Sequence, residues 1–165
     1  FGLNNGMVPI IAYNYGAGHK DRVIKTIKHS VAYGVGIMFV GLLAMHIFPA
    51  QLMRMFDAEE SLIAIGAPAL ETISLSFVFA GFCIVTGSVF QALGNGVYSM
   101  IVSVARQMCV LLPVAKLLSL SGEVTLIWWA FPIAELASVL LTSYFLVRIY
   151  RKVICHIGEP VVQDA

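Results

Sequence analysis

The sequence predicts an all-α integral membrane protein, and two observations carry that prediction. Of the 165 residues, 59% are hydrophobic and only 12% are charged, and the mean hydropathy is +0.90. Soluble domains are about half apolar and a quarter charged, so this chain has too little polar surface for solution. In addition, the chain contains long apolar runs of roughly 18–24 residues, enough to cross a hydrocarbon core of about 30 Å.

The predicted spans are bounded by charged residues, glycines and prolines. They cover residues 31–48, 73–93, 97–118 and 124–147. The opening stretch 1–15 is too short to span and is interpreted as the end of a truncated helix. We therefore expect four complete transmembrane helices and part of a fifth. Residues 1–152 form the membrane domain in this interpretation, and residues 153–165 form a cytoplasmic tail.

The distribution of basic residues predicts the orientation. If the four spans alternate in direction, one side of the membrane carries Lys20, Arg22, Lys25, Lys28, Arg148, Arg151 and Lys152. The opposite side carries Arg54 and, near a helix end, Lys116. Cytoplasmic loops hold the excess of Lys and Arg, so the C-terminus is predicted to be cytoplasmic.

Two connecting segments are predicted to form short helices of their own. In residues 19–30, Val23, Ile24 and Ile27 share one helical face, which is typical of an interfacial helix lying on the inner leaflet. In residues 53–65, Asp57 is expected to cap a short outer helix, with Glu60 reaching back to it.

Several classes of function are disfavoured by the sequence. The net charge of +1 leaves no basic stripe for nucleic acid. The segment "GAGHKD", residues 16–21, lacks the third glycine of a dinucleotide fingerprint and the ending of a phosphate loop. The four histidines are scattered and the three cysteines have no metal-type spacing. We therefore expect no enzyme activity, no bound metal and no cofactor.

Two ionisable residues lie deep in the predicted spans. Arg106 is about 13 Å, and Glu135 about 18 Å, from the predicted cytoplasmic face at 1.5 Å per residue. Each costs on the order of 2.5–3.5 kcal/mol at the membrane midplane, so each needs a partner or water. Their helices are consecutive and antiparallel. We therefore predict that Arg106 and Glu135 pair or share one hydrated cavity, either as a structural lock or for transport.

Polar and small residues form stripes on three of the spans. These stripes are Thr72, Ser76, Ala80, Cys83, Gly87 and Gln91; Ser99, Ser103 and Gln107; and Glu135, Ser138 and Thr142. Most of these positions are interpreted as close helix packing. Gln91 and Gln107 carry larger amides and are predicted to line a cavity. Pro113 and Pro132 are expected to interrupt backbone hydrogen bonding in the last two spans.

Four segments together resemble a known family. "PIIAYNYGAGHKDRV", "VFQALGNG", "SVARQMCVLLP" and "WWAFPIAE", in this order and spacing, resemble the multidrug and toxic compound extrusion (MATE) family, and especially its bacterial MepA-like branch. The resemblance covers the chain to about Lys152. It implies a twelve-helix fold of two six-helix bundles, of which this chain would be a C-terminal fragment.

The resemblance also implies a function. Such proteins export cationic amphipathic drugs by antiport against H⁺ or Na⁺, so the bilayer, these drugs, the ion and the first six-helix bundle of the same polypeptide are the expected partners. Some branches carry a cation-binding acid in the tenth helix, but residues 79–85 here read "FAGFCIV". A coupling carboxylate would then be Glu135, with Arg106 tuning it, or would lie in the first bundle.

Two alternatives stay open from the sequence. The first is a flippase for lipid-linked precursors, whose cavity should be strongly cationic; Arg106 as the single deep cation argues against it. The second is a non-transporting membrane scaffold subunit, in which the buried charges could be replaced by apolar residues. The favoured interpretation is a multi-pass drug antiporter of the bacterial inner membrane.

Overall fold

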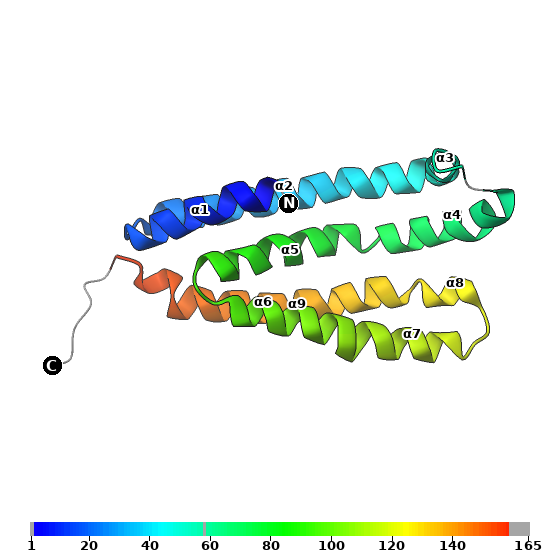
Figure 1. The fold of residues 1–165 in the computed structure, drawn as a ribbon. Coiled ribbons are helices and arrows are strands. Elements are labelled where there is room, and N and C mark those ends of the chain that lie inside the picture. Colours follow the sequence, from blue (N-terminus) through cyan, green and yellow to red (C-terminus); the bar gives the residue numbers. More distant parts are fainter. Residues whose placement is uncertain (1, 58, 159–165) are drawn as a thin grey trace.

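The computed structural model describes residues 2–57 and 59–158, and every regular element in these ranges is helical. Three helices, Lys20–Ile47, Gly96–Ser119 and Val124–His156, are long and apolar enough to cross a membrane. A fourth span is formed if the bent pair Glu60–Ser74 and Phe77–Ala92 is counted as one. Together they make an elongated bundle (Figure 1). The predicted all-α membrane fold is confirmed.

The chain begins with α1 (Gly2–Gly16) and α2 (Lys20–Ile47), which pack against each other. The predicted interfacial helix over residues 19–30 is wrong, because α2 runs without a break from Lys20 into the span. The physical reason is that Val23 is fully buried in the core, so the first turns of α2 pack against the bundle instead of lying on the membrane surface. The helix α2 packs most extensively on α5 (Phe77–Ala92).

The outer connection also differs from expectation. Two helices, α3 (Pro49–Arg54) and α4 (Glu60–Ser74), follow α2. Asp57 does not cap α4; it adopts a left-handed conformation with φ of 53°, and α4 begins three residues later. Glu60 instead forms an exposed ion pair with Arg54 at 3.2 Å. The predicted capping interaction is therefore replaced by a surface contact across the loop.

The second predicted span is broken near its start. α4 and α5 meet at an angle of 53°. At the break, the Ser74 hydroxyl donates to the carbonyl of Glu71 and the Ser76 hydroxyl to that of Ile73. Such local bonds compete with the helical ladder and bend helices. The helix that was expected from residue 73 thus begins at Phe77.

The third span changes helix type along its length. It consists of α6 (Gly96–Val104), a π-helical segment η1 (Ala105–Leu111) and α7 (Leu112–Ser119). Pro113 has no N–H for an α-helical bond, and its ring clashes with the carbonyl four residues earlier, that of Cys109. The wider π turn directly before Pro113 accommodates this clash. The sequence predicted the interruption but not its form.

The last span is divided at the two tryptophans. α8 (Val124–Ile127) is followed after Trp128 and Trp129 by α9 (Ala130–Lys152). Pro132 lies in the first turn of α9, where a missing N–H disrupts no helical bond. It therefore starts the helix instead of kinking its middle. The helix α9 also runs past residue 147 to Lys152.

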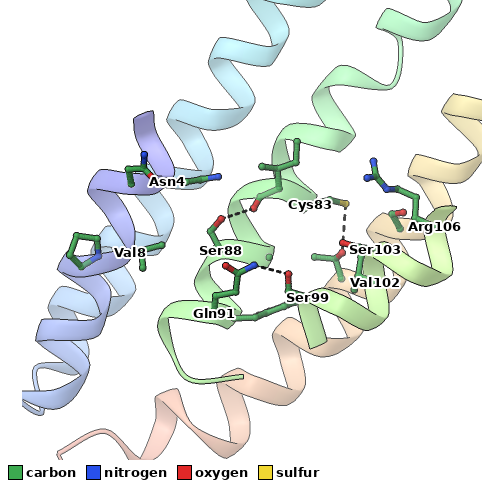
Figure 2. A pocket seen from close by; sticks show the side chains of 16 residues that line it. Asn4, Val8, Cys83, Ser88, Gln91, Ser99, Val102, Ser103 and Arg106 are labelled. Carbon is green, nitrogen blue, oxygen red and sulfur yellow. Dashed lines mark hydrogen bonds between the residues drawn. The ribbon is translucent and has the colours of Figure 1, made fainter. Parts of the chain in front are cut away.

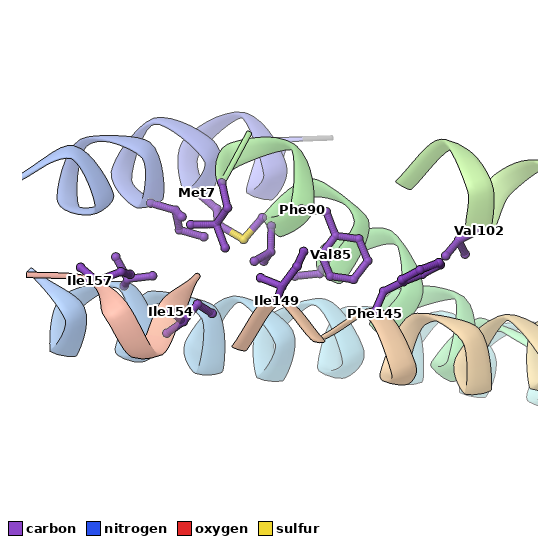
Figure 3. Packing of buried hydrophobic residues seen from close by; sticks show 12 residues of the cluster. Met7, Val85, Phe90, Val102, Phe145, Ile149, Ile154 and Ile157 are labelled. Carbon is purple, nitrogen blue, oxygen red and sulfur yellow. The ribbon is translucent and has the colours of Figure 1, made fainter. Parts of the chain in front are cut away.

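A hydrophobic core fills the end of the bundle that holds the α1–α2 and α5–α6 turns. Its buried members are Met7, Ile11, Val23, Val85, Val89, Phe90, Leu93, Val102, Phe145, Ile149, Ile154 and Ile157 (Figure 3). Tyr98 stacks on Phe145 with ring centroids 4.5 Å apart and meets the edge of Phe90. The core thus joins α1, α2, α5, α6 and α9 at this end.

The chain after α9 is part of that core. The short 3₁₀ helix η2 (Ile154–His156) buries Ile154, and Lys20 Nζ donates to the carbonyl of Cys155 at 2.8 Å. The tail expected from residue 153 therefore does not begin there, because residues 154–157 pack back on the bundle. The expected tail residues 159–165 lie outside the described residues. The Lys20 contact also places the two basic clusters at one end of the bundle.

Candidate functional site

A polar cavity of about 530 Å³ lies in the middle of the bundle. It is bounded by α1, α5, α6, η1 and α9 (Figure 2). Its walls carry amides, hydroxyls and one cation, namely Asn4, Asn5, Gln91, Ser88, Ser99, Ser103, Ser138, Thr142 and Arg106. Ligand sites are concave, with a small number of polar groups placed in an apolar surround. This cavity is therefore the candidate binding site.

Part of each predicted polar stripe lines the cavity, whereas Thr72, Ser76 and Ala80 of the first stripe lie outside it. Gly87 and Gln91 of α5 face α6, where Gln91 Nε2 donates to Ser99 Oγ at 3.0 Å. On the opposite side, Thr142 Oγ1 of α9 donates to Cys83 Sγ at 3.6 Å. Gly87 also lets α5 and α6 approach closely, since a Cβ at this position would meet Ser99 Oγ at 3.4 Å. The stripes thus serve packing and the cavity wall together.

Arg106 and Glu135 form the ion pair that the sequence predicted. Arg106 Nη1 donates to Glu135 Oε1 at 2.5 Å. The Glu135 side chain is 8% exposed, whereas that of Arg106 is 37% exposed. Arg106 lines the cavity and Glu135 does not, so the arginine stands between the carboxylate and the open space. The pair links the cavity wall to the buried face of α9.

One oxygen of this carboxylate has no partner. Within the described residues, Glu135 Oε2 is buried and accepts no hydrogen bond. A buried charged group needs its lone pairs satisfied to offset the cost of desolvation. The second oxygen of Glu135 is therefore a buried acceptor that no donor among the described residues satisfies.

The π-helical segment positions the arginine. Arg106 is the second residue of η1, and η1 packs directly on α9. π-Helical turns occur mostly as single turns, frequently at functional sites. The same change of helical register explains why Gln107, which was predicted to line the cavity, does not do so. It is exposed and is not among the lining residues, because the four-residue spacing from Ser103 no longer keeps one face in a π-helix.

Residues of α1 are the part of the site that the sequence interpretation missed. Asn4 and Asn5 line the cavity, and Figure 2 shows Asn4 on the side facing α5. The available signal was a pair of adjacent amides among the mostly apolar residues of the first turns of α1. The short apolar segment 1–15 by itself does not show that these amides line a cavity.

The site carries no arrangement typical of metal binding. In residues 2–57 and 59–158, no three His, Cys, Asp or Glu side chains lie close enough together to hold a metal ion. The cavity instead combines neutral hydrogen-bonding groups with one arginine, whose partner Glu135 is buried outside the cavity lining. Such a surface can bind a polar or amphipathic ligand and can respond to charge.

Comparison with known proteins identifies the family. The family model MatE matches residues 1–117, which is more than half of the chain. The chain is 24% identical over 151 residues to the multidrug export protein MepA of Staphylococcus haemolyticus (strain JCSC1435), covering 92% of this chain and 33% of that relative. It is 27% identical over 135 residues to MepA of Staphylococcus aureus (strain N315), covering 81% and 29%.

The chain thus spans about a third of the length of the curated relatives that it matches. No solved structure gave a significant match. The matched residues include α1, α5, α6 and η1, which build most of the cavity wall. With its all-helical, multi-pass architecture, the chain belongs to the MatE family of membrane transporters.

Proposed function

We propose that this chain is the C-terminal part of a multidrug efflux antiporter that exports cationic amphipathic drugs in exchange for H⁺ or Na⁺. The observation that carries the proposal is the Arg106–Glu135 ion pair, whose arginine lines the polar cavity. Ionisable residues inside a membrane are costly and mark ion or substrate pathways. The family and the MepA relatives support export as the overall activity.

The proposed coupling follows from the unequal burial of the pair. Arg106 is the more exposed partner, so it is the side chain that can turn toward the cavity. Its departure would leave Glu135 charged and uncompensated in a buried position, a state that is strongly unfavourable. Uptake of a proton or a sodium ion by the carboxylate relieves that cost. Export and ion uptake are coupled in this way through one carboxylate.

The drug would bind between this chain and the first six-helix bundle of the same polypeptide. Gln91 and the serines that line the cavity would contact it from this half, and the first bundle would supply the other half. Alternating access rests on two repeats that move around a shared site. We place the protein in the bacterial inner membrane with its C-terminus in the cytoplasm, because both basic clusters lie at one end of the bundle. The transport cycle requires no cofactor and no enzyme activity.

The two alternatives make different predictions about charge. A flippase for lipid-linked precursors would hold a pyrophosphate, yet Arg106 is the single basic residue among those lining the cavity. A scaffold subunit has no need for a charged pair at this depth. Replacing Arg106 and Glu135 together by apolar residues would then leave its function unchanged.

The test is ethidium efflux from energised, drug-sensitive cells that express the transporter containing this chain. We expect faster efflux than in empty-vector cells, collapse of efflux when the ion gradients are dissipated, and loss of efflux in Glu135→Gln. Glu71→Gln is the matched control, because Glu71 is an exposed carboxylate on α4.

A charge reversal separates transport from structure. If the pair is only a structural lock, Arg106→Glu combined with Glu135→Arg restores protein level and efflux together. If Glu135 takes up the coupling ion, the reversed pair restores protein level while efflux stays lost. Absence of ethidium efflux with the protein confirmed in the membrane would contradict the drug-export proposal.

A further inference from the structure

A second, apolar cavity lies at the basic end of the bundle, away from the polar site. It has a volume of about 280 Å³ and opens between the first turns of α2 and the end of α9. Helix α2 contributes Ile24, Ile27 and Lys28, α9 contributes Leu146, Val147 and Tyr150, and η2 closes the cavity with Ile154. The surface that lines this groove is almost entirely apolar, so Lys28 and Tyr150 contribute to it mainly through the carbon atoms of their side chains.

The groove lies where lipid headgroups meet hydrocarbon. The 28 residues of α2 measure about 42 Å at 1.5 Å per residue, which exceeds a hydrocarbon core of about 30 Å. The segment from Lys28 to Ile47 alone accounts for about 29 Å. Lys28 therefore sits at the boundary, and α9 agrees, since its apolar run ends at Val147 and is followed by Arg148.

Exposed cations lie at the groove or close to its lining residues in the sequence. Lys25 is one helical turn from Lys28, and Arg151 adjoins Tyr150; all three basic side chains are exposed. The ion pairs found in residues 2–57 and 59–158 involve none of them. Basic residues at the cytoplasmic membrane surface attract anionic lipids, and basic pockets between transmembrane helices bind anionic headgroups. The groove thus combines an apolar floor with an excess of positive charge.

We propose that this groove binds one anionic phospholipid of the bilayer. The phosphate would lie at Lys28, which can extend its ammonium group toward the headgroup layer, and the Tyr150 hydroxyl would donate to the same phosphate. The first methylenes of an acyl chain would contact Ile27 and Val147 at the end of the groove nearest the hydrocarbon. The lipid would then bridge α2 and α9, which are otherwise linked at this end through η2, since η2 contacts both helices. This inference is independent of the drug-export proposal.

The test is native mass spectrometry of the full-length protein with phosphatidylglycerol or with phosphatidylcholine carrying the same acyl chains. We expect the wild type to retain one phosphatidylglycerol in preference to phosphatidylcholine. Lys28→Gln should reduce that preference about fivefold, the effect expected for one basic residue at the membrane surface. Lys152→Gln is the matched control, since it removes an exposed cation at the same end that does not line the groove.

A second variant tests the apolar half of the site. Val147 is 50% exposed, so a larger side chain can enter the groove without displacing the core. Val147→Trp should reduce retention of both lipids while the far-ultraviolet circular dichroism stays unchanged. Equal retention of the two lipids by the wild type, or equal effects of Lys28→Gln and Lys152→Gln, would overturn the proposal. The proposal would also be overturned if a second copy of the protein covered the groove, which would be seen as a dimer that retains no phospholipid.

Discussion

Two regions of the bundle are built on opposite principles. The end with the α1–α2 turn is filled by apolar side chains such as Ile11, Phe90 and Ile149, each at most 1% exposed. The middle holds a polar cavity and a charged pair, beside a π-helical segment. In a membrane, helices associate by close packing and by polar contacts, because lipid is as apolar as the helices. We therefore expect the packed end to contribute most of the stability of the bundle, and the helices around the polar cavity to change conformation more easily.

The largest expected effect tests the packed end. Phe90 is fully buried in the packed end, meets the edge of Tyr98 and borders the polar cavity, so Phe90→Ala leaves a void between α5, α6 and α9. We expect a loss of about 3 kcal/mol in the free energy of unfolding. The measurement is unfolding in mixed micelles followed by circular dichroism. Phe79→Ala is the control, because Phe79 is 37% exposed and should cost much less. Equal losses would mean that the packed end is not the more stable region.

An intermediate effect is expected at the charged pair. Arg106→Gln leaves the Glu135 carboxylate buried without its charged partner. Because the Arg106 side chain is 37% exposed, we expect a loss of about 2 kcal/mol, less than for a fully buried pair. Adding Glu135→Gln removes the unpaired charge and should recover most of that loss. The same unfolding measurement on the single and double variants gives the coupling energy of the pair. If the two losses simply add, the residues do not act as a pair.

The smallest effect is expected at the cavity wall. Gln91→Ala removes the hydrogen bond to Ser99, and polar contacts between membrane helices contribute only about 0.6 kcal/mol. Gln107→Ala provides the comparison, since Gln107 is exposed outside the cavity. We expect no measurable change in stability for that control. A loss at Gln91 as large as that at Phe90 would remove the distinction between the two regions.

The hydrophobic pattern was sufficient for the location of the spans but not for their internal breaks. Residues 97–118 were predicted as one span and form Gly96–Ser119. The bend between α4 and α5 depends on hydroxyls that bond locally to the backbone, and hydropathy does not contain that information. Val23 illustrates the same limit. Its helical face is apolar whether it meets a membrane surface or the core of the bundle.

The sequence predicted the part of the candidate site that carries charged side chains, because a charge inside the membrane has a high free-energy cost. Arg106 and Glu135 stood out because each needs a partner at membrane depth, and the predicted pair is present. Gln107 stood in the same α-helical stripe as Ser103, but the π turn rotates it away from the cavity. Asn4 and Asn5 were not selected, because nothing in their local pattern shows which helix they will face.

The sequence by itself determined the solvent of this protein, its spans, its family resemblance and the deep charges, because composition and periodicity record which surfaces must avoid water. Only the tertiary structure decided which faces meet. It placed α1 against α5, turned Arg106 toward α9 through a π-helical segment and folded Ile154 back into the core. These outcomes depend on packing between residues far apart in the chain, where side-chain shape and backbone hydrogen bonding select one arrangement among many that hydrophobicity permits.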